Sequence, residues 1–248
     1  MTGGSQYMLL EVKGLSRSFG SVKGADGVDL AVERGEAVGI VGPNGAGKTT
    51  LFNLIAGNLA ADAGTILLNG LDVTRKPAHE RCVAGIGRAY QIPHPFENLT
   101  VFENLLVAAV HGRNAPGNHV RDSVDFCAAI LEDTGLIARA DTPAGTLTLL
   151  ERKRLELARA LATGPELLLL DEIAGGLTEG ECHALVGTIK GIRARGTTIV
   201  WIEHIVHALL AVVNRLVVLN FGRKIAEGDP AAVMASAEVR EIYTGIAA

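Results

Sequence analysis

The stretch Gly42-Pro43-Asn44-Gly45-Ala46-Gly47-Lys48-Thr49 matches the pattern G-x-x-x-x-G-K-[ST] at every fixed position. It follows the apolar run Ala37–Val41, which suits a buried strand, and a helix is predicted from about Lys48. Glycines let backbone N–H groups close around phosphate oxygens, and the start of a helix adds positive potential there. We therefore expect a phosphate-binding loop in which Lys48 reaches the β- and γ-phosphates of a nucleotide and the Thr49 hydroxyl binds Mg²⁺. A plain glycine-rich turn is the alternative, and the strand-loop-helix context argues against it.

A second acidic motif follows another apolar strand. Residues 167–170 are four leucines, and Asp171 and Glu172 come directly after them. A buried strand does not tolerate unpaired charge, so the two carboxylates belong at the carboxyl edge of the sheet, where phosphates bind in such folds. We expect Asp171 to hold Mg²⁺ through water and Glu172 to orient or deprotonate the attacking water. The acidic pair is weak evidence alone and strong evidence beside the phosphate loop.

Strand and helix patterns alternate along most of the chain. The other predicted strands are 10–12, 28–32, 65–68, 167–170 and 197–202. The predicted helices after the phosphate loop are 101–110, 122–134, 150–162, 179–192 and 231–243. Such alternation implies a largely parallel sheet covered on both faces, and a helical block at 92–162 interrupts it. The predicted fold class is therefore α/β, a P-loop NTPase core with a mostly parallel sheet and an inserted α-helical subdomain.

The composition limits the possible classes of protein but does not identify a function. The chain has 248 residues, 48% of them hydrophobic, which suffices for a single domain over 1–248. A net charge of −4 and the absence of a basic stripe argue against a nucleic-acid partner. The basic cluster Arg152 to Arg154 is interpreted as a charged, solvated helix face. Cys82, Cys127 and Cys182 form no CxxC pair, which indicates reduced thiols and neither a disulfide framework nor a zinc site.

No membrane-inserting segment is predicted. The longest apolar stretches, such as 208–213, are far too short to span a bilayer. Residues 1–7 are short and polar and lack the apolar core of a signal sequence. If the protein works at a membrane, another subunit must anchor it.

With these motifs in place, the chain resembles the ATPase subunits of ATP-binding cassette (ABC) transporters over nearly its full length. The resemblance implies ATP and Mg²⁺ as ligands, with Thr50 completing the nucleotide-binding set that begins at Gly42, and an antiparallel N-terminal β part. Gln91 follows a short strand-like stretch, as the family's glutamine loop does, which implies catalytic and Mg²⁺-binding roles. His204 follows the 197–202 strand, as the switch histidine does, and Phe19 lies where an aromatic stacks on adenine.

Each of these residues also has a structural interpretation. Gln91 could be an ordinary surface glutamine, and Phe19 could be a core aromatic. His204 with His207 and Glu203 could suggest a metal site, but H-x-x-H lacks the i, i+4 spacing and the third ligand of the helical zinc motif. We therefore favour the roles that the resemblance implies.

The family's signature sequence, usually Leu-Ser-Gly-Gly-Gln, is altered here. The aligned residues are Leu147, Thr148, Leu149, Leu150 and Glu151, so both glycines are missing. In the family this segment faces the γ-phosphate bound by the opposite subunit, and a branched side chain should hinder that approach. Thr148 followed by Glu151 predicts a capping box, so the helix start should persist and the Thr148 hydroxyl could still donate to phosphate. The contact is expected to be weakened rather than lost.

Two further family positions are recognisable. Gly175-Gly176-Leu177-Thr178 lies where the dimer-contact loop lies, and Ile173 replaces the usual proline after the glutamate. Because that proline mainly stiffens a turn, the replacement should cost little.

Within the family, residues 98–106, 154–159 and 239–245 are most similar to the branched-chain amino acid importer ATPases of bacteria. The resemblance implies an ATP-hydrolysing importer subunit, for branched-chain or other hydrophobic amino acids, held peripherally at the cytoplasmic face of the inner membrane. Its implied partners are transmembrane permease subunits and a second ATPase subunit, either an identical copy or a paralogue. A lipid-exporter motor and a low-turnover regulatory subunit remain alternatives. An ATPase acting on DNA or ribosomes is disfavoured, because the chain has no second cassette, coiled-coil insertion or basic patch.

Overall fold

The computed structural model describes residues 8–113 and 120–244, so the segment 1–7 discussed above lies outside the described part. The described strands are β1 (Met8–Phe19), β2 (Val22–Glu33), β3 (Ala37–Val41), β4 (Ala63–Leu68), β5 (Leu71–Asp72), β6 (Ile86–Ala89), β7 (Leu167–Asp171), β8 (Thr198–Ile202), β9 (Arg215–Asn220) and β10 (Arg223–Gly228). The described α-helices are α1 (Lys48–Ala56), α2 (Ala78–Ala84), α3 (Val101–His111), α4 (Val120–Asp133), α5 (Leu149–Ala162), α6 (Glu179–Ala194), α7 (Val206–Leu210), α8 (Pro230–Ala235) and α9 (Ala237–Thr244).

The strands form two sheets within the described residues. An antiparallel sheet has the order β2-β1-β4-β5, and a second sheet has the order β10-β9-β3-β8-β7-β6. All neighbours in the second sheet are parallel except β10, which pairs antiparallel with β9 at one edge. The predicted α/β fold, with a mostly parallel sheet and an antiparallel N-terminal part, is confirmed.

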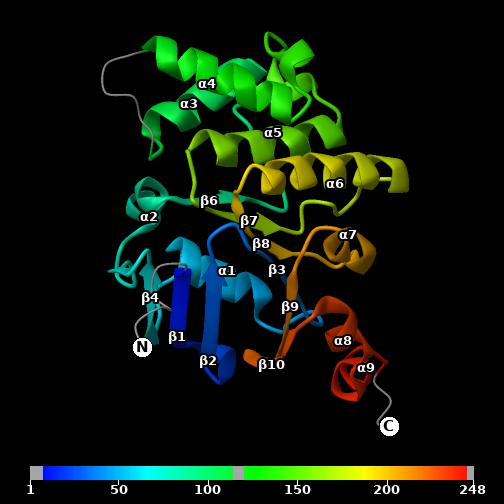
Figure 1. The fold of residues 1–248 in the computed structure, drawn as a ribbon. Coiled ribbons are helices and arrows are strands. Elements are labelled where there is room, and N and C mark those ends of the chain that lie inside the picture. Colours follow the sequence, from blue (N-terminus) through cyan, green and yellow to red (C-terminus); the bar gives the residue numbers. More distant parts are fainter. Residues whose placement is uncertain (1–7, 114–119, 245–248) are drawn as a thin grey trace.

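The strands of the parallel sheet are apolar throughout because both of their faces are covered. On β3, Val38 and Ile40 pack into one hydrophobic cluster with α1 and the antiparallel sheet, whereas Ala37 and Val41 pack into another with α6. In Figure 1, α1 lies beside β1 and β2 and α6 lies across the sheet from them. The layers are therefore antiparallel sheet and α1, parallel sheet, and outer helices.

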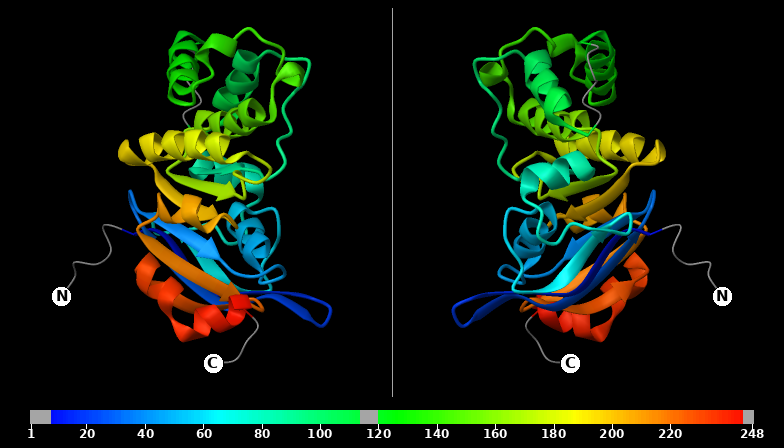
Figure 2. Two further views of the ribbon diagram at one scale, coloured as in Figure 1. Left: turned by 90° about the vertical axis from the view of Figure 1, so that its right-hand side faces the viewer. Right: turned by 90° about the vertical axis from the view of Figure 1, so that its left-hand side faces the viewer.

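Helices α3, α4 and α5 follow β6 and precede β7 in the chain, and they gather at one end of the molecule (Figures 1 and 2). They share a core of their own, which includes Val101, Leu105, Leu131 and Leu155. That 92–162 acts as a subdomain inside one domain of 1–248 stays a prediction.

Two details differ from the sequence-based expectations. The predicted helix 231–243 is divided into α8 and α9 at Ser236, whose backbone is extended and whose hydroxyl and N–H both donate to the Val233 carbonyl, closing the first helix locally. The basic cluster in α5 is not a solvated face throughout, because Lys153 is only 3% exposed. Among the described residues, no helix has the length and apolar character needed to cross a membrane.

Candidate functional site

The phosphate loop connects β3 to α1, and its glycines are required by close backbone approaches. Gly42 has φ of 153°, and a Cβ there would lie 2.2 Å from the Leu219 carbonyl oxygen. Gly47 has φ of 100°, and its Cβ would lie 2.2 Å from the Gly24 carbonyl oxygen. Because backbone atoms cannot yield to a side chain, this loop can keep its shape only with glycine at both positions. The β1–β2 hairpin and the end of β9 thus support the loop from two sides.

Lys48 is the first residue of α1 and turns back over the loop. Its ammonium group donates to the carbonyl oxygens of Gly42 at 2.7 Å and Pro43 at 3.0 Å. Although it follows a loop at the edge of the sheet, Lys48 is buried and only 5% exposed. Burial lowers the pKa of Lys48, and the charges of Glu172 and Asp171 act in the opposite direction. The two carboxylates therefore help to keep a buried lysine charged beside the place for phosphate.

A cavity of about 320 Å³ opens above the loop. It is lined by Phe19, Val22, Lys23, Gly24, residues 44–50 and Glu172. Phe19 is 49% exposed, so it is not a core aromatic, and the Arg17 guanidinium lies 5.5 Å from the centre of its ring. The structure thus brings together Phe19, the phosphate loop through Thr50, and Glu172, as the nucleotide-binding prediction requires.

Glu172 lies just beyond β7 in the left-handed backbone region, with φ of 48°. Its N–H donates to the Ile202 carbonyl at 2.8 Å, which fixes the backbone against β8. One carboxylate oxygen accepts a hydrogen bond from the Gln91 amide at 2.8 Å, and the other lies 2.7 Å from His204 Nε2. A non-glycine residue in this region is strained, and such strain concentrates at functional sites. Of the three residues predicted to be catalytic, Gln91 and His204 thus both contact Glu172.

Asp171, at the end of β7, has a partner that the sequence patterns did not single out. Its carboxylate pairs with the Arg88 guanidinium at 2.5 Å, and both side chains are 6% exposed. Arg88 also donates to Asn53 at 2.7 Å and lies 4.6 Å from the centre of the Tyr90 ring. The available signal was a charged residue in the apolar strand β6, which pairs in parallel with β7. Arg88 therefore holds the carboxylate that is expected to act on Mg²⁺.

The three residues predicted to act on Mg²⁺ offer oxygen atoms at one edge of the sheet. Thr49 lines the cavity, Gln91 contacts its neighbour Glu172, and Asp171 ends β7. Mg²⁺ prefers hard oxygen ligands and usually keeps several waters while binding substrate phosphates through one or two protein groups. The donor set fits that ion, and Thr49 belongs to the loop that would hold the phosphates.

Thr148 does not line this cavity. It is the N-cap of α5, and the predicted capping box with Glu151 is present. The Thr148 hydroxyl lies 3.0 Å from a Glu151 carboxylate oxygen, and the other oxygen of Glu151 accepts from Arg139 at 2.8 Å. Leu149 is 45% exposed, and its side chain lies against Gly176 of the predicted dimer-contact loop. Any contact of Thr148 with phosphate would therefore involve a nucleotide held by another subunit.

The chain is similar in sequence and in fold to known proteins. A sequence profile described as "ABC transporter" matches residues 25–175. The high-affinity branched-chain amino acid transport ATP-binding protein BraF of Pseudomonas aeruginosa is 35% identical, over 96% of this chain and 98% of that protein. The lipopolysaccharide export system ATP-binding protein LptB of Haemophilus influenzae is 34% identical, over 96% and 97%. A crystal structure of an ATP-binding cassette of an ABC transporter in its ADP conformation matches with a TM-score of 0.87 and 33% identity, over 96% and 99%.

Proposed function

The chain belongs to the ABC transporter family of ATPases, and from that premise we propose that it is the ATP-hydrolysing subunit of an importer for branched-chain or other hydrophobic amino acids. Proteins of this family couple ATP hydrolysis to transport, form dimers and work with transmembrane permease subunits. The finer assignment, import of hydrophobic amino acids, is supported by the similarity to BraF over nearly the whole of both chains.

One observation carries the catalytic part of the proposal. Glu172 reaches the cavity wall with its two oxygens engaged by Gln91 and His204, and the phosphate loop lines the same cavity. A carboxylate has about four lone-pair positions, so a water can still donate to Glu172 while both neighbours hold it. In this proposal Glu172 orients the attacking water and accepts its proton, and Gln91 and His204 keep the carboxylate aimed.

The remaining residues bind and polarise the nucleotide. Backbone N–H groups of 44–50 would surround the phosphates, and Lys48 would leave the loop carbonyls to reach the β- and γ-oxygens. Phe19 would stack on the adenine. Mg²⁺, when bound through Thr49, Gln91 and water on Asp171, supplies charge neutralisation on the phosphate oxygens.

We propose that two ATPase subunits work face to face, with Thr148 of one subunit near the nucleotide of the other. The altered signature then affects the partner's site, and the phosphate loop and Glu172 of this chain remain complete. A paralogue with an unaltered signature would complete this chain's own site. A paralogous partner is therefore favoured over an identical copy.

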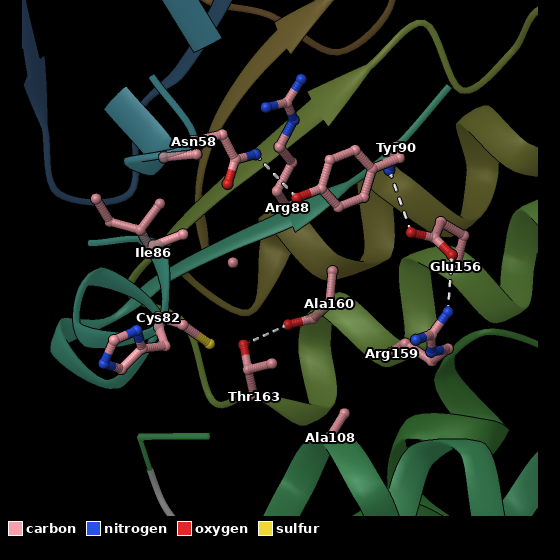
Figure 3. Close-up of a pocket in the computed structure, with 14 residues that line it drawn as sticks. Asn58, Cys82, Ile86, Arg88, Tyr90, Ala108, Glu156, Arg159, Ala160 and Thr163 are labelled. Atoms are coloured by element: carbon pink, nitrogen blue, oxygen red, sulfur yellow. Dashed lines mark hydrogen bonds and ion pairs between the residues drawn. The ribbon is translucent and has the colours of Figure 1, made fainter. Parts of the chain in front are cut away.

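The permease contact is proposed at 93–96 and at the groove beside it. Phe96 is 48% exposed, so it does not pack into the helical core as a buried aromatic would. The groove has a volume of about 310 Å³ and runs between the core and helix α5, with Asn58, Cys82, Tyr90, Glu156 and Thr163 among its lining residues (Figure 3). Attachment there would hold the subunit at the cytoplasmic face of the membrane, peripherally.

The experiment that tests the transported class is uptake by a strain lacking this chain. Uptake of labelled leucine, isoleucine and valine should fall and should return with the wild-type chain but not with Lys48→Ala. Lysine uptake is the control and should be unchanged. A second candidate, the motor of a lipid exporter, is favoured by the similarity to LptB. Normal uptake of all three amino acids together with a defect in surface lipid would favour that candidate.

A further inference from the structure

Three side chains on one face of α5 bind the backbone of the loop that carries Gln91. Lys153, Glu156 and Arg159 are spaced three residues apart, which places them on one side of the helix. The Lys153 ammonium donates to the Gln91 carbonyl, Glu156 accepts from the Tyr90 N–H at 3.4 Å, and Arg159 donates to the His94 carbonyl at 2.7 Å. Figure 3 shows Glu156 between Tyr90 and Arg159. We call Lys153, Glu156 and Arg159 the α5 clasp.

The clasp is largely buried, which makes its bonds hard to exchange for water. Lys153 is 3% exposed and Glu156 is 6% exposed. Burial lowers the pKa of Lys153, and the nearby carboxylates of Glu203, Glu156 and Glu172 counteract that change. A buried charge that loses its partner is costly, so these contacts favour one arrangement of loop and helix over looser ones.

The Gln91 side chain of this loop contacts the Glu172 carboxylate. The Gln91 backbone is held by Lys153, and the Gln91 amide contacts Glu172 at 2.8 Å. A displacement of α5 would therefore be transmitted to the Gln91 amide through the backbone rather than absorbed by a free loop.

The two ends of helix α5 lie near the two proposed partner contacts. Helix α5 begins after Thr148, which caps the end proposed to meet a second ATPase subunit. Arg159, nearer the other end of the helix, lies 5.2 Å from the centre of the Phe96 ring beside the proposed permease groove. One rigid helix thus connects both surfaces to the loop that touches Glu172.

We propose that Lys153 and Arg159 are positioning residues for ATP hydrolysis, which hold the Gln91 amide on Glu172 only while α5 keeps its present place. The inference rests on the catalytic roles proposed above for Gln91 and Glu172. It deepens that function by naming the residues that hold the loop of Gln91 in place.

The test is a double-mutant cycle on the full chain, measured as steady-state ATP hydrolysis. Lys153→Met should lower kcat about tenfold, the effect of losing one charge-assisted hydrogen bond, with KM for ATP within about twofold of wild type. In a Gln91→Ala background, Lys153→Met should lower kcat by less than about twofold, because the side chain that Lys153 positions is already absent. Lys153→Arg should recover most of the activity. Lys190→Met, at an exposed site on α6, is the matched control and should leave kcat unchanged.

Two results would overturn the inference that Lys153 acts through Gln91. Losses from Lys153→Met and Gln91→Ala that multiply would show that Lys153 does not act through Gln91, as would a raised KM with unchanged kcat. If Lys153→Met does not fold, Arg159→Met replaces it in the same cycle, because its side chain is 22% exposed and less of the core depends on it. Glu172→Gln distinguishes failure of the proposed function from failure of this inference. If Glu172→Gln is active, both the catalytic assignment and the role of the clasp are wrong. If it is inactive and the losses in kcat from Lys153→Met and Gln91→Ala multiply, only the role of the clasp is wrong.

Discussion

Replacing Arg88 with Met should destabilise the protein far more than the loss of a surface ion pair. The Arg88 and Asp171 side chains are each 6% exposed, so the variant would leave a carboxylate buried beside β6 without its cation. Breaking a buried pair by removing one partner costs about 3–5 kcal/mol. For a chain of this size each kcal/mol lowers Tm by about 2–4 °C, so Tm should fall by roughly 6–20 °C.

The assay is urea unfolding followed by the fluorescence of Trp201, the single tryptophan, which is buried on β8 beside β7. Arg195→Met is the control, because its pair with Asp133 is 49% and 35% exposed and should contribute less than about 1 kcal/mol. In a cycle with Asp171→Asn, the double variant should be more stable than the two separate losses predict, by at least about 1.5 kcal/mol. A loss for Arg88→Met within about 1 kcal/mol of wild type, or a coupling near zero, would refute the reasoning.

Three further predictions concern the loop and the altered signature. Lys48→Ala should weaken ATP binding by about 10- to 100-fold in calorimetry, since a charged donor to phosphate is lost, and unchanged binding would contradict the phosphate-loop assignment. Glu151→Gln should lower the free energy of unfolding by about 0.5–1 kcal/mol at neutral pH, because the carboxylate caps α5. Hydrogen bonds from the Thr148 N–H and hydroxyl and from Arg139 lower the pKa of Glu151, so this stabilisation is present above the unfolded pKa and disappears as pH falls through the folded pKa. An equal difference in urea unfolding at pH 7 and near pH 3 would argue against the capping account. Replacing Leu149 and Leu150 with glycine should raise the rate of phosphate release by the isolated chain several-fold, and adding a paralogue with an intact signature should raise it further. If the isolated chain hydrolyses ATP quickly and neither change alters the rate, the two leucines do not hinder hydrolysis.

The parts of the site that could be predicted are those fixed by local spacing. The phosphate loop and the Asp171-Glu172 pair each follow an apolar strand, and parallel strands bring their carboxyl ends to one edge of the sheet. The family resemblance then pointed to Gln91 and His204, which the structure places on the two oxygens of Glu172. These residues required no knowledge of long-range packing.

The parts that could not be predicted depend on contacts between distant segments. Lys153 lies in a run of three basic residues, a pattern that is typical of a solvated helix face, and only the loop at Gln91 makes it a buried donor. Arg88 likewise depends on the pairing of β6 with β7. The division between α8 and α9 rests on the Ser236 backbone and side chain, which helix periodicity does not reveal.

The measurement that tests the central claim most directly is ATP turnover by Glu172→Gln. The variant should bind ATP with near wild-type affinity while kcat falls by about 100-fold or more, because the oriented base is lost and the phosphate loop is intact. In the presence of the paralogous partner, trapped nucleotide should also stabilise the closed dimer, which size-exclusion chromatography would show as a larger species with ATP. Hydrolysis near the wild-type rate would contradict the account, because the carboxylate held by Gln91 and His204 would then have no part in the reaction.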